Sequence, residues 1–192
     1  MISYLSKSPG IGGIIKSSPE DFLVEEISPD GTIYELGKQF SKLDAGTMYT
    51  HFILQKTDWS TSSAISEIAK RLHTSQTNLN FAGTKDKMAV STQLASVRGE
   101  RKDVLAALRI KDISINGAWG SNERVRLGEL SGNRFTITIR DVKSDAEAKI
   151  KQIASELGDN IPNYFGEQRF GSARNNTHLI GETLLKGEIE EA

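Results

Sequence analysis

The chain has 192 residues, with 24 Lys and Arg against 25 Asp and Glu, three His and no Cys. Without Cys it has no disulfide, no thiolate zinc site and no cysteine nucleophile, which favours a reducing, cytoplasmic setting. No pair among His51, His73 and His178 has the spacing of metal ligands, so we expect no metal. The sequence contains no run of 18 apolar residues and no leader-like start, so we expect a soluble protein without a membrane partner.

The charges are unevenly distributed along the chain. Residues 83–140 carry 11 basic and 6 acidic side chains, whereas residues 1–82 carry 7 basic and 9 acidic ones. A locally basic surface is typical of proteins that bind phosphate backbones, because neutralised phosphates release their counterions. The other interpretation of the basic block is an ordinary solvated face with mixed charges.

Alternation and turn residues predict several strands. We expect short strands at 13–16, 22–27 and 79–82, and extended segments at 88–97 and near Ile113 and Val125. The segment 47–56 has apolar residues on both faces and is therefore predicted to be a central strand. The strictest alternation in the chain runs over 133–140 and predicts one continuous strand.

Helical spacing is found in four places. Residues 64–72 follow possible N-caps at 60–63, and a second helix is predicted to turn Val104, Leu105 and Leu108 inward. A capping box from Ser144 to Glu147 opens a helix that Gly158 ends, and a last short helix covers 179–186. With strands grouped between the helices, the fold class is predicted to be α+β, with a mixed or antiparallel sheet and flanking helices.

Asp86 is the first candidate catalytic residue. It follows a short apolar strand and a glycine turn, and it lies between Lys85 and Lys87. Nearby positive charge favours the ionised carboxylate, which can act as a nucleophile or a base. The alternative is an ordinary turn aspartate beside surface lysines, because Asp is common in turns.

Two further stretches are candidates for base recognition. Phe135 is either a core residue on the face of Ile137 and Ile139 or an aromatic that stacks on a base, with Asn133 offering its amide to the base edge. The run 161–171 contains three aromatic residues, two glycines and a Glu-Gln-Arg triplet. It is either a rigid turn under a site or a structural corner with a buried pair of Glu167 and Arg169.

Four ordered motifs resemble those of the TruD family of tRNA pseudouridine synthases. They lie at residues 15–26, 81–93, 127–135 and 162–171. The resemblance implies the pseudouridine synthase catalytic fold, tRNA as partner and no cofactor, and we also expect a monomer. It also implies isomerisation of a D-arm uridine, at position 13 of the tRNA, to pseudouridine.

The resemblance also assigns roles to individual residues. It implies that Asp86 is the catalytic aspartate, which either attacks the substrate covalently or removes a sugar proton, and that Lys16 is the basic residue paired with it. It implies substrate contacts for Phe22, Asn133 and Phe135, and we add Lys85 to this group. The remaining expected site residues support the pocket: Tyr164, Phe165, Glu167 and Arg169.

The family's chains continue well beyond the fourth motif. We therefore expect residues 1–171 to be the N-terminal part of the catalytic domain and residues 172–192 to start a segment leading to an inserted domain. On this interpretation the fold is incomplete at its C-terminus, and the 192-residue chain alone is inactive or weak. Two alternatives stay open: an RNA-binding module without catalysis, and a nucleoside glycosidase that releases free uracil.

Overall fold

A computed structural model describes residues 5–161, 163 and 176–188. The chain forms two compact units, residues 12–143 and residues 1–11 together with 144–192. The expected boundary between residues 171 and 172 falls outside the described residues and stays a prediction.

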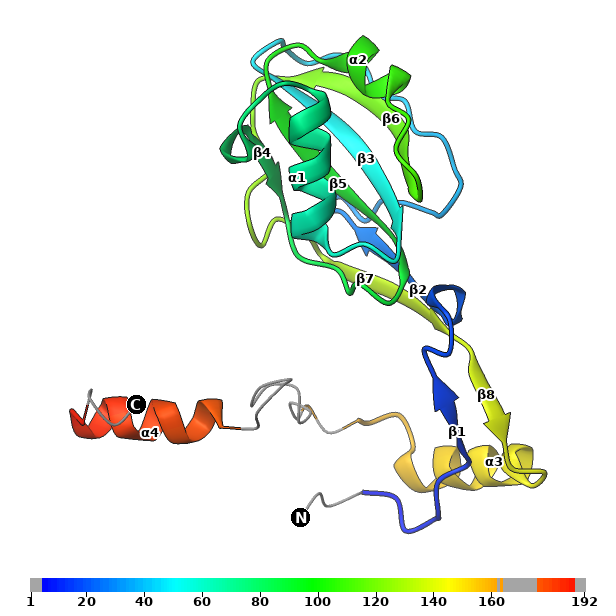
Figure 1. Cartoon of the computed structure of the whole chain (residues 1–192). Helices are drawn as coiled ribbons and strands as arrows, with labels where there is room; N and C mark the ends of the chain where they lie inside the picture. The colour runs from blue at the N-terminus through cyan, green and yellow to red at the C-terminus, as the bar shows by residue number, and fades with distance from the viewer. Residues whose placement is uncertain (1–4, 162, 164–175, 189–192) are drawn as a thin grey trace. The chain divides into compact units, whose positions relative to one another are not determined.

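A six-stranded mixed sheet dominates the larger unit (Figure 1). Its strands follow the order β6-β3-β5-β2-β7, and β4 pairs with β5 beside this path. Only β2 and β5 run parallel, which confirms the predicted α+β class with a mixed sheet. The strands are β2 (Phe22–Ile27), β3 (Tyr49–Thr57), β4 (Leu79–Phe81), β5 (Val90–Arg98), β6 (Ile113–Ser121) and β7 (Gly132–Ile137).

Strand β3 is central, as its two apolar faces predict. It lies between β5 and β6 and pairs with β5 along its whole length, from Tyr49 opposite Arg98 to Thr57 opposite Val90. The other edge of β5 is shared. Its first residues pair with β2 and its later residues pair with β4.

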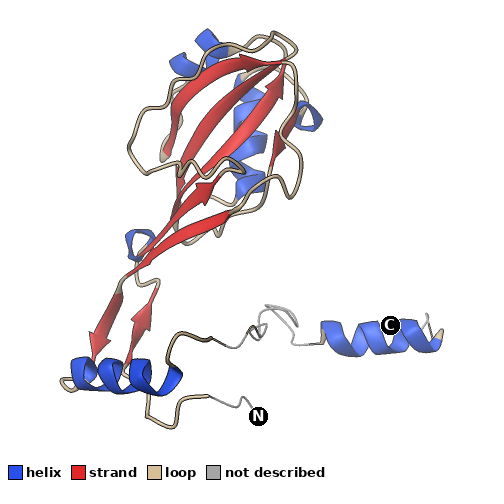
Figure 2. Cartoon of the chain, turned by 180° about the vertical axis from the view of Figure 1, so that it is seen from behind, coloured by secondary structure: helices blue, strands red, loops and turns tan. Residues whose placement is uncertain are grey.

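One face of the sheet carries the main hydrophobic core. Helix α1 (Thr61–Arg71) covers this face (Figure 2). Its Ile65 and Ile68 belong to one buried cluster with Phe52 and Leu54 of β3. The helix begins at its predicted cap, where the Ser60 side chain accepts a hydrogen bond from the Ser63 amide at 3.1 Å. Helix α2 (Lys102–Ala107) contributes Leu105 to the same core.

A smaller core lies on the opposite face. It consists of Tyr34, Ile53 and Trp119, with Phe40 and Leu94 packed against them. Tyr34 and Phe40 come from the segment between β2 and β3, and that segment therefore covers this face of the sheet.

The predicted strand over 133–140 is two strands. Residues of β7 pair with β2, whereas β8 (Ile139–Val142) pairs with β1 (Gly12–Ile15) in a separate two-stranded sheet. At the break, the Thr138 amide donates a hydrogen bond to the carbonyl of Asp21 at 2.8 Å. Alternation alone does not reveal such a change of partner, because both strands keep the same period of two.

Three local predictions are wrong. Val104 is exposed, because α2 has only six residues and buries Leu105 alone. Val125 lies in a loop, where its amide donates to the Ser96 hydroxyl at 3.0 Å instead of joining a strand. The capping box does not form, since α3 (Ala146–Leu157) begins after Asp145 and not after Ser144, and the Asp145 side chain makes no cap hydrogen bond.

The smaller unit contains α3 and α4 (Thr177–Lys186). Gly158 ends α3 as predicted, with a positive φ of 60°. The Glu156 carboxylate accepts hydrogen bonds from the hydroxyls of Ser6 and Ser8. The Ser8 and Ser6 hydroxyls lower the pKa of Glu156 to about 2.

Among the described residues, no helix has both the length and the hydropathy that a membrane crossing requires. The same residues contain no group of three or more His, Asp or Glu side chains placed to hold a metal ion.

Candidate active site

Lys16 and Asp86 meet at the edge of the sheet where two parallel strands begin. Lys16 precedes β2, and Asp86 lies in the loop that precedes β5. Because parallel neighbours start at the same edge of a sheet, the segments that lead into them come together there. The Lys16 ammonium forms a hydrogen-bonded ion pair with Oδ2 of Asp86.

The backbone at Lys16 is unusual. Its φ of 57° lies in the left-handed region, which costs a residue with a Cβ about 1 kcal/mol. Such strain is often found at functional positions. From this backbone the ammonium lies 4.0 Å from the centroid of the Phe22 ring, within range of a cation–π contact, while it pairs with Asp86.

Phe22 and Phe135 form an aromatic pair beside the ion pair. Their ring centroids are 5.8 Å apart in an edge-to-face arrangement at 62°. Phe135 lies opposite Val24 in the β2–β7 ladder, which puts it diagonally across from Phe22 on one face. Its side chain is 53% exposed, so the core alternative for Phe135 is wrong and its ring is accessible to a ligand.

Asn133 lies on this same face, opposite Glu26 in the ladder. Its side-chain oxygen is buried and has no hydrogen-bond partner in the structure. A buried carbonyl oxygen without a partner is costly and is uncommon in folded proteins. Asn133 therefore keeps an unused acceptor near the candidate site.

Lys85 differs from its neighbour Asp86. Its side chain is 3% exposed, and its ammonium donates to Oε2 of Glu26 at 2.5 Å. The other oxygen of Glu26 accepts from the Leu94 amide at 2.9 Å. The structure thus places Lys85 in a buried ion pair, so its predicted substrate contact gains no support from the geometry.

Three side chains bind the backbone of the loop formed by residues 83–87, here called the Asp86 loop. The side-chain amide of Gln93 donates to the Gly83 carbonyl at 3.0 Å, and the Thr61 hydroxyl accepts from the backbone amide of Lys85 at 2.8 Å. The ammonium of Lys56 donates to the carbonyl of Asp86 at 2.9 Å. These bonds fix the loop between α1 and the sheet.

Sequence reasoning missed Lys56, although its signal was present. It continues the face of Phe52 and Leu54 along β3, where the pattern demands an apolar residue, and its side chain is completely buried. Burial lowers the pKa of Lys56 to about 8; the Asp86 carboxylate opposes this shift and the charge of Lys85 adds to it.

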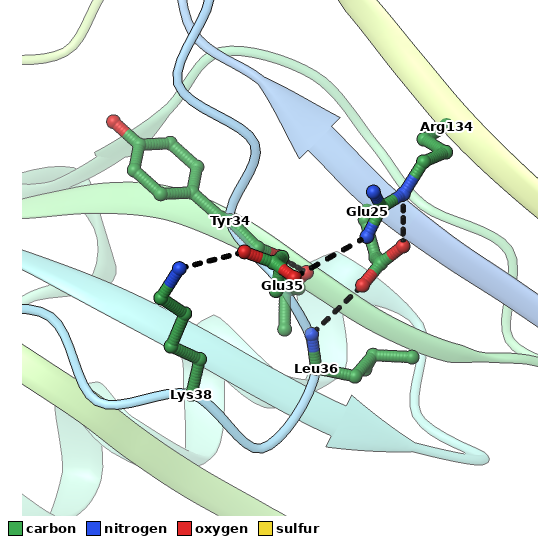
Figure 3. Close-up of polar contacts among 7 residues, drawn as sticks. Glu25, Tyr34, Glu35, Leu36, Lys38 and Arg134 are labelled. Atoms are coloured by element: carbon green, nitrogen blue, oxygen red, sulfur yellow. Dashed lines mark hydrogen bonds and ion pairs between the residues drawn. The ribbon is translucent and has the colours of Figure 1, made fainter.

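The opposite face of β2 holds a second polar cluster (Figure 3). Glu25 accepts from the Leu36 amide at 2.9 Å and from Nε of Arg134 at 2.6 Å. Arg134 also lies 3.8 Å from Glu35, which pairs with Lys38. The hydrogen bond from Arg134 lowers the pKa of Glu25. This cluster ties β7 to β2 at the position between Asn133 and Phe135.

Arg140 forms an ion pair with the residue that precedes β2. Its guanidinium binds both oxygens of the buried Asp21 carboxylate, with Nε at 2.8 and 2.9 Å and a terminal nitrogen at 2.6 Å. The hydrogen bonds from Arg140 lower the pKa of Asp21. Asp21 immediately precedes Phe22, so this pair fixes the start of β2.

These pairs change the interpretation of the basic block. Lys85, Arg134 and Arg140 are neutralised by Glu26, Glu25 and Asp21, which all lie in the acidic first part of the chain. Part of the block's charge therefore stabilises the fold and is not presented to a ligand. The four expected support residues, Tyr164, Phe165, Glu167 and Arg169, lie outside the described residues.

Comparisons with known proteins agree on one family. The family model for tRNA pseudouridine synthase D (TruD) matches residues 1–192. A probable tRNA pseudouridine synthase D of Methanococcus vannielii is 41% identical over 192 residues, covering 98% of this chain and 49% of the relative. A probable tRNA pseudouridine synthase D of Thermococcus onnurineus is 44% identical over 191 residues, covering 98% of this chain and 43% of the relative.

A solved structure gives the same result. The crystal structure of the putative tRNA pseudouridine synthase D from Methanosarcina mazei has 31% identity and a TM-score of 0.77, covering all of this chain and 42% of the other. The chain thus spans about half the length of the relatives it matches. By the family match over its whole length, the chain belongs to the tRNA pseudouridine synthase D (TruD) family.

Proposed function

We propose that the chain contributes the catalytic aspartate of a tRNA pseudouridine synthase. The observation that carries this proposal is the ion pair of Lys16 and Asp86 beside the accessible ring of Phe135, in a chain of this family. The substrate is a uridine of the tRNA D arm, at position 13 by resemblance to the family. The chain acts in the cytoplasm, as a monomer and without a cofactor.

The reaction is an isomerisation. The bond between N1 of uracil and C1′ of ribose breaks, the base turns, and a new bond joins C5 to C1′, while the proton lost from C5 is balanced by one gained at N1. Asp86 either bonds covalently to the substrate or removes a sugar proton. In either role its carboxylate must be held in place, and the Lys16 ammonium pairs with one of its oxygens.

The flanking residues suit a base that has left its stack. An enzyme reaches C1′ only after the nucleotide turns out of the helix, and the freed base then stacks on aromatic side chains. Phe135 offers a half-exposed ring, and the Asn133 oxygen is an unused acceptor on the same face. Because that oxygen is buried, the Asn133 side chain must turn outward before it can accept from a donor such as the uracil N3–H group.

The test is a single-turnover assay with purified chain in excess over unmodified tRNA transcripts. We expect slow formation of pseudouridine at uridine 13, no release of free uracil, and no product with Asp86→Asn. Asp103→Asn, at an exposed position of helix α2, is the matched control and should behave like the unaltered chain.

The other outcomes separate the alternatives. Retention of tRNA without any pseudouridine fits both the binding module and an inactive partial chain, and tRNA from cells with and without the gene distinguishes these two. Release of uracil supports the glycosidase. Conversion that persists in Asp86→Asn contradicts the proposed role of Asp86.

A further inference from the structure

Lys56 is the one residue of β3 whose charged group reaches the Asp86 loop in the described structure. Its Nζ lies 2.9 Å from the carbonyl oxygen of Asp86 and donates a hydrogen bond to it. The side chain is completely buried, whereas Asp86 itself faces solvent on its carboxylate side. Lys16 and Lys56 therefore hold Asp86 at two different points, the carboxylate and the backbone.

The neighbours of Lys56 leave its charge little other compensation. Opposite it on the adjacent strands lie Ser91 and Ile113, which are uncharged. The ionisable groups that act on it are Asp86 and Lys85, and Lys85 is already paired with Glu26. Burying an ammonium in such surroundings is costly for a fold.

An apolar residue at this position would continue the core and avoid that cost. Phe52 and Leu54 precede Lys56 on the same face of β3, and both are completely buried. A lysine at this position lowers the stability of the fold. Its ammonium, however, provides a charged hydrogen-bond donor to the backbone of Asp86.

We propose that Lys56 is a positioning residue, whose buried ammonium fixes the backbone of Asp86 so that the carboxylate faces the substrate. The inference rests on the proposed function of Asp86 for its catalytic meaning. Its structural content, that the Asp86 loop depends on the charge of Lys56, is independent of tRNA.

The loop amides report this dependence directly. The Lys85 amide donates to Thr61, and the Ala89 amide donates to the Lys87 carbonyl at 2.8 Å. Hydrogen exchange at these two amides, expressed as protection relative to the unstructured chain, measures how firmly the loop is held. The Leu72 amide, bonded to Ile68 in α1, is the internal reference for the rest of the unit.

In the unaltered chain we expect protection at Lys85 and Ala89 to fall about tenfold between pH 7 and pH 9.5, as Lys56 loses its proton. The midpoint should match the titration of the Lys56 side chain observed by NMR at its Cε group, near pH 8. Lys56→Met should show low protection at both pH values, with Leu72 unaffected. Lys70→Met is the matched control, because the Lys70 side chain on α1 is 73% exposed, and it should behave like the unaltered chain.

Unchanged loop protection in Lys56→Met at pH 7 overturns the inference. If Lys56→Met loses protection at Leu72 as well, the substitution has disturbed the whole unit, and the pH titration of the unaltered chain is the test. A loop transition that follows the Lys56 titration supports the inference, and a loop that stays equally protected through it contradicts the inference.

The single-turnover uridine assay tests whether Lys56 also affects catalysis. Lys56→Met should reduce the rate constant for conversion at least tenfold while the Kd for tRNA stays within twofold, because the residue acts through Asp86 and touches no substrate. If Asp86→Asn converts uridine as fast as the unaltered chain, the proposed function fails, while the exchange result still stands by itself.

Discussion

Lys16 and Asp86 are 70 positions apart in the chain and share a hydrogen-bonded ion pair at the start of two parallel strands. The pair joins a lysine with a left-handed backbone to an aspartate whose loop is bound by α1 and two strands. The proposed chemistry depends on this juxtaposition.

Lys16→Met should reduce uridine conversion about 100-fold and leave the fold intact, because it removes the charge that holds the Asp86 carboxylate. Lys111→Met is the control, since the Lys111 side chain is 92% exposed. Single-turnover rates measured beside far-ultraviolet circular dichroism separate the two effects. A rate within threefold of the unaltered chain would show that the ion pair has no catalytic role.

Phe135→Ala should weaken productive tRNA binding about tenfold, the usual effect of removing one base–aromatic stack. The unfolding free energy should fall by only about 1 kcal/mol, because the ring is half-exposed and loses mainly its contact with Phe22. Ile137→Ala, two residues along the same face and 45% exposed, is the matched variant. Equal effects of both substitutions on tRNA binding would count against a stacking role for Phe135.

Lys56 should make stability depend on alkaline pH with a definite sign. Its pKa is about 8 in the fold against 10.5 unfolded, so between these values the unfolded chain binds more protons and stability rises with pH. Relative to Lys56→Met, the unaltered chain should gain at most about 3 kcal/mol over this range, at 1.36 kcal/mol for each pH unit. Urea unfolding of both proteins at pH 7 and 10.5 measures the gain. A difference that is constant with pH would contradict it.

Asp21 should give the opposite dependence at acid pH. Arg140 lowers its pKa below the ordinary 3.8, so its contribution to stability is complete above that value and disappears as pH falls through the folded pKa. Asp21→Asn should therefore lower the urea midpoint at pH 7 and have a smaller effect at pH 3, below the ordinary pKa of 3.8. Asp159→Asn, an exposed aspartate, controls for charge alone. The account is wrong on this point if Asp21→Asn destabilises equally at both pH values.

Local patterns in the sequence predict most of the sheet but not its pairing. Alternation identifies β2 and β3, and the cap at Ser60 identifies the start of α1, because these signals lie within a few residues. The parallel pairing of β2 with β5 leaves no such local signal, although it is what brings Lys16 to Asp86. Lys16 and Phe22 were therefore identified only through family resemblance, whereas Asp86, Asn133 and Phe135 were already candidates from their local sequence.

Adjacent residues in an irregular loop are equally hard to distinguish from sequence. Lys85 and Asp86 are neighbours, yet one side chain is buried with Glu26 and the other is half-exposed beside Lys16. Composition also misled, since the basic block included arginines that pair with Glu25 and Asp21. Lys56 could have been found, because a charge on the apolar face of a strand is itself a signal.

The central claim is that this chain supplies the aspartate that converts a D-arm uridine, and mapping pseudouridine in cellular tRNA tests it most directly. Cells that lack the gene for this chain should lose pseudouridine at position 13, regain it with the unaltered gene, and fail to regain it with Asp86→Asn. Unchanged pseudouridine at every tRNA position after deletion, or full restoration by Asp86→Asn, would contradict the claim.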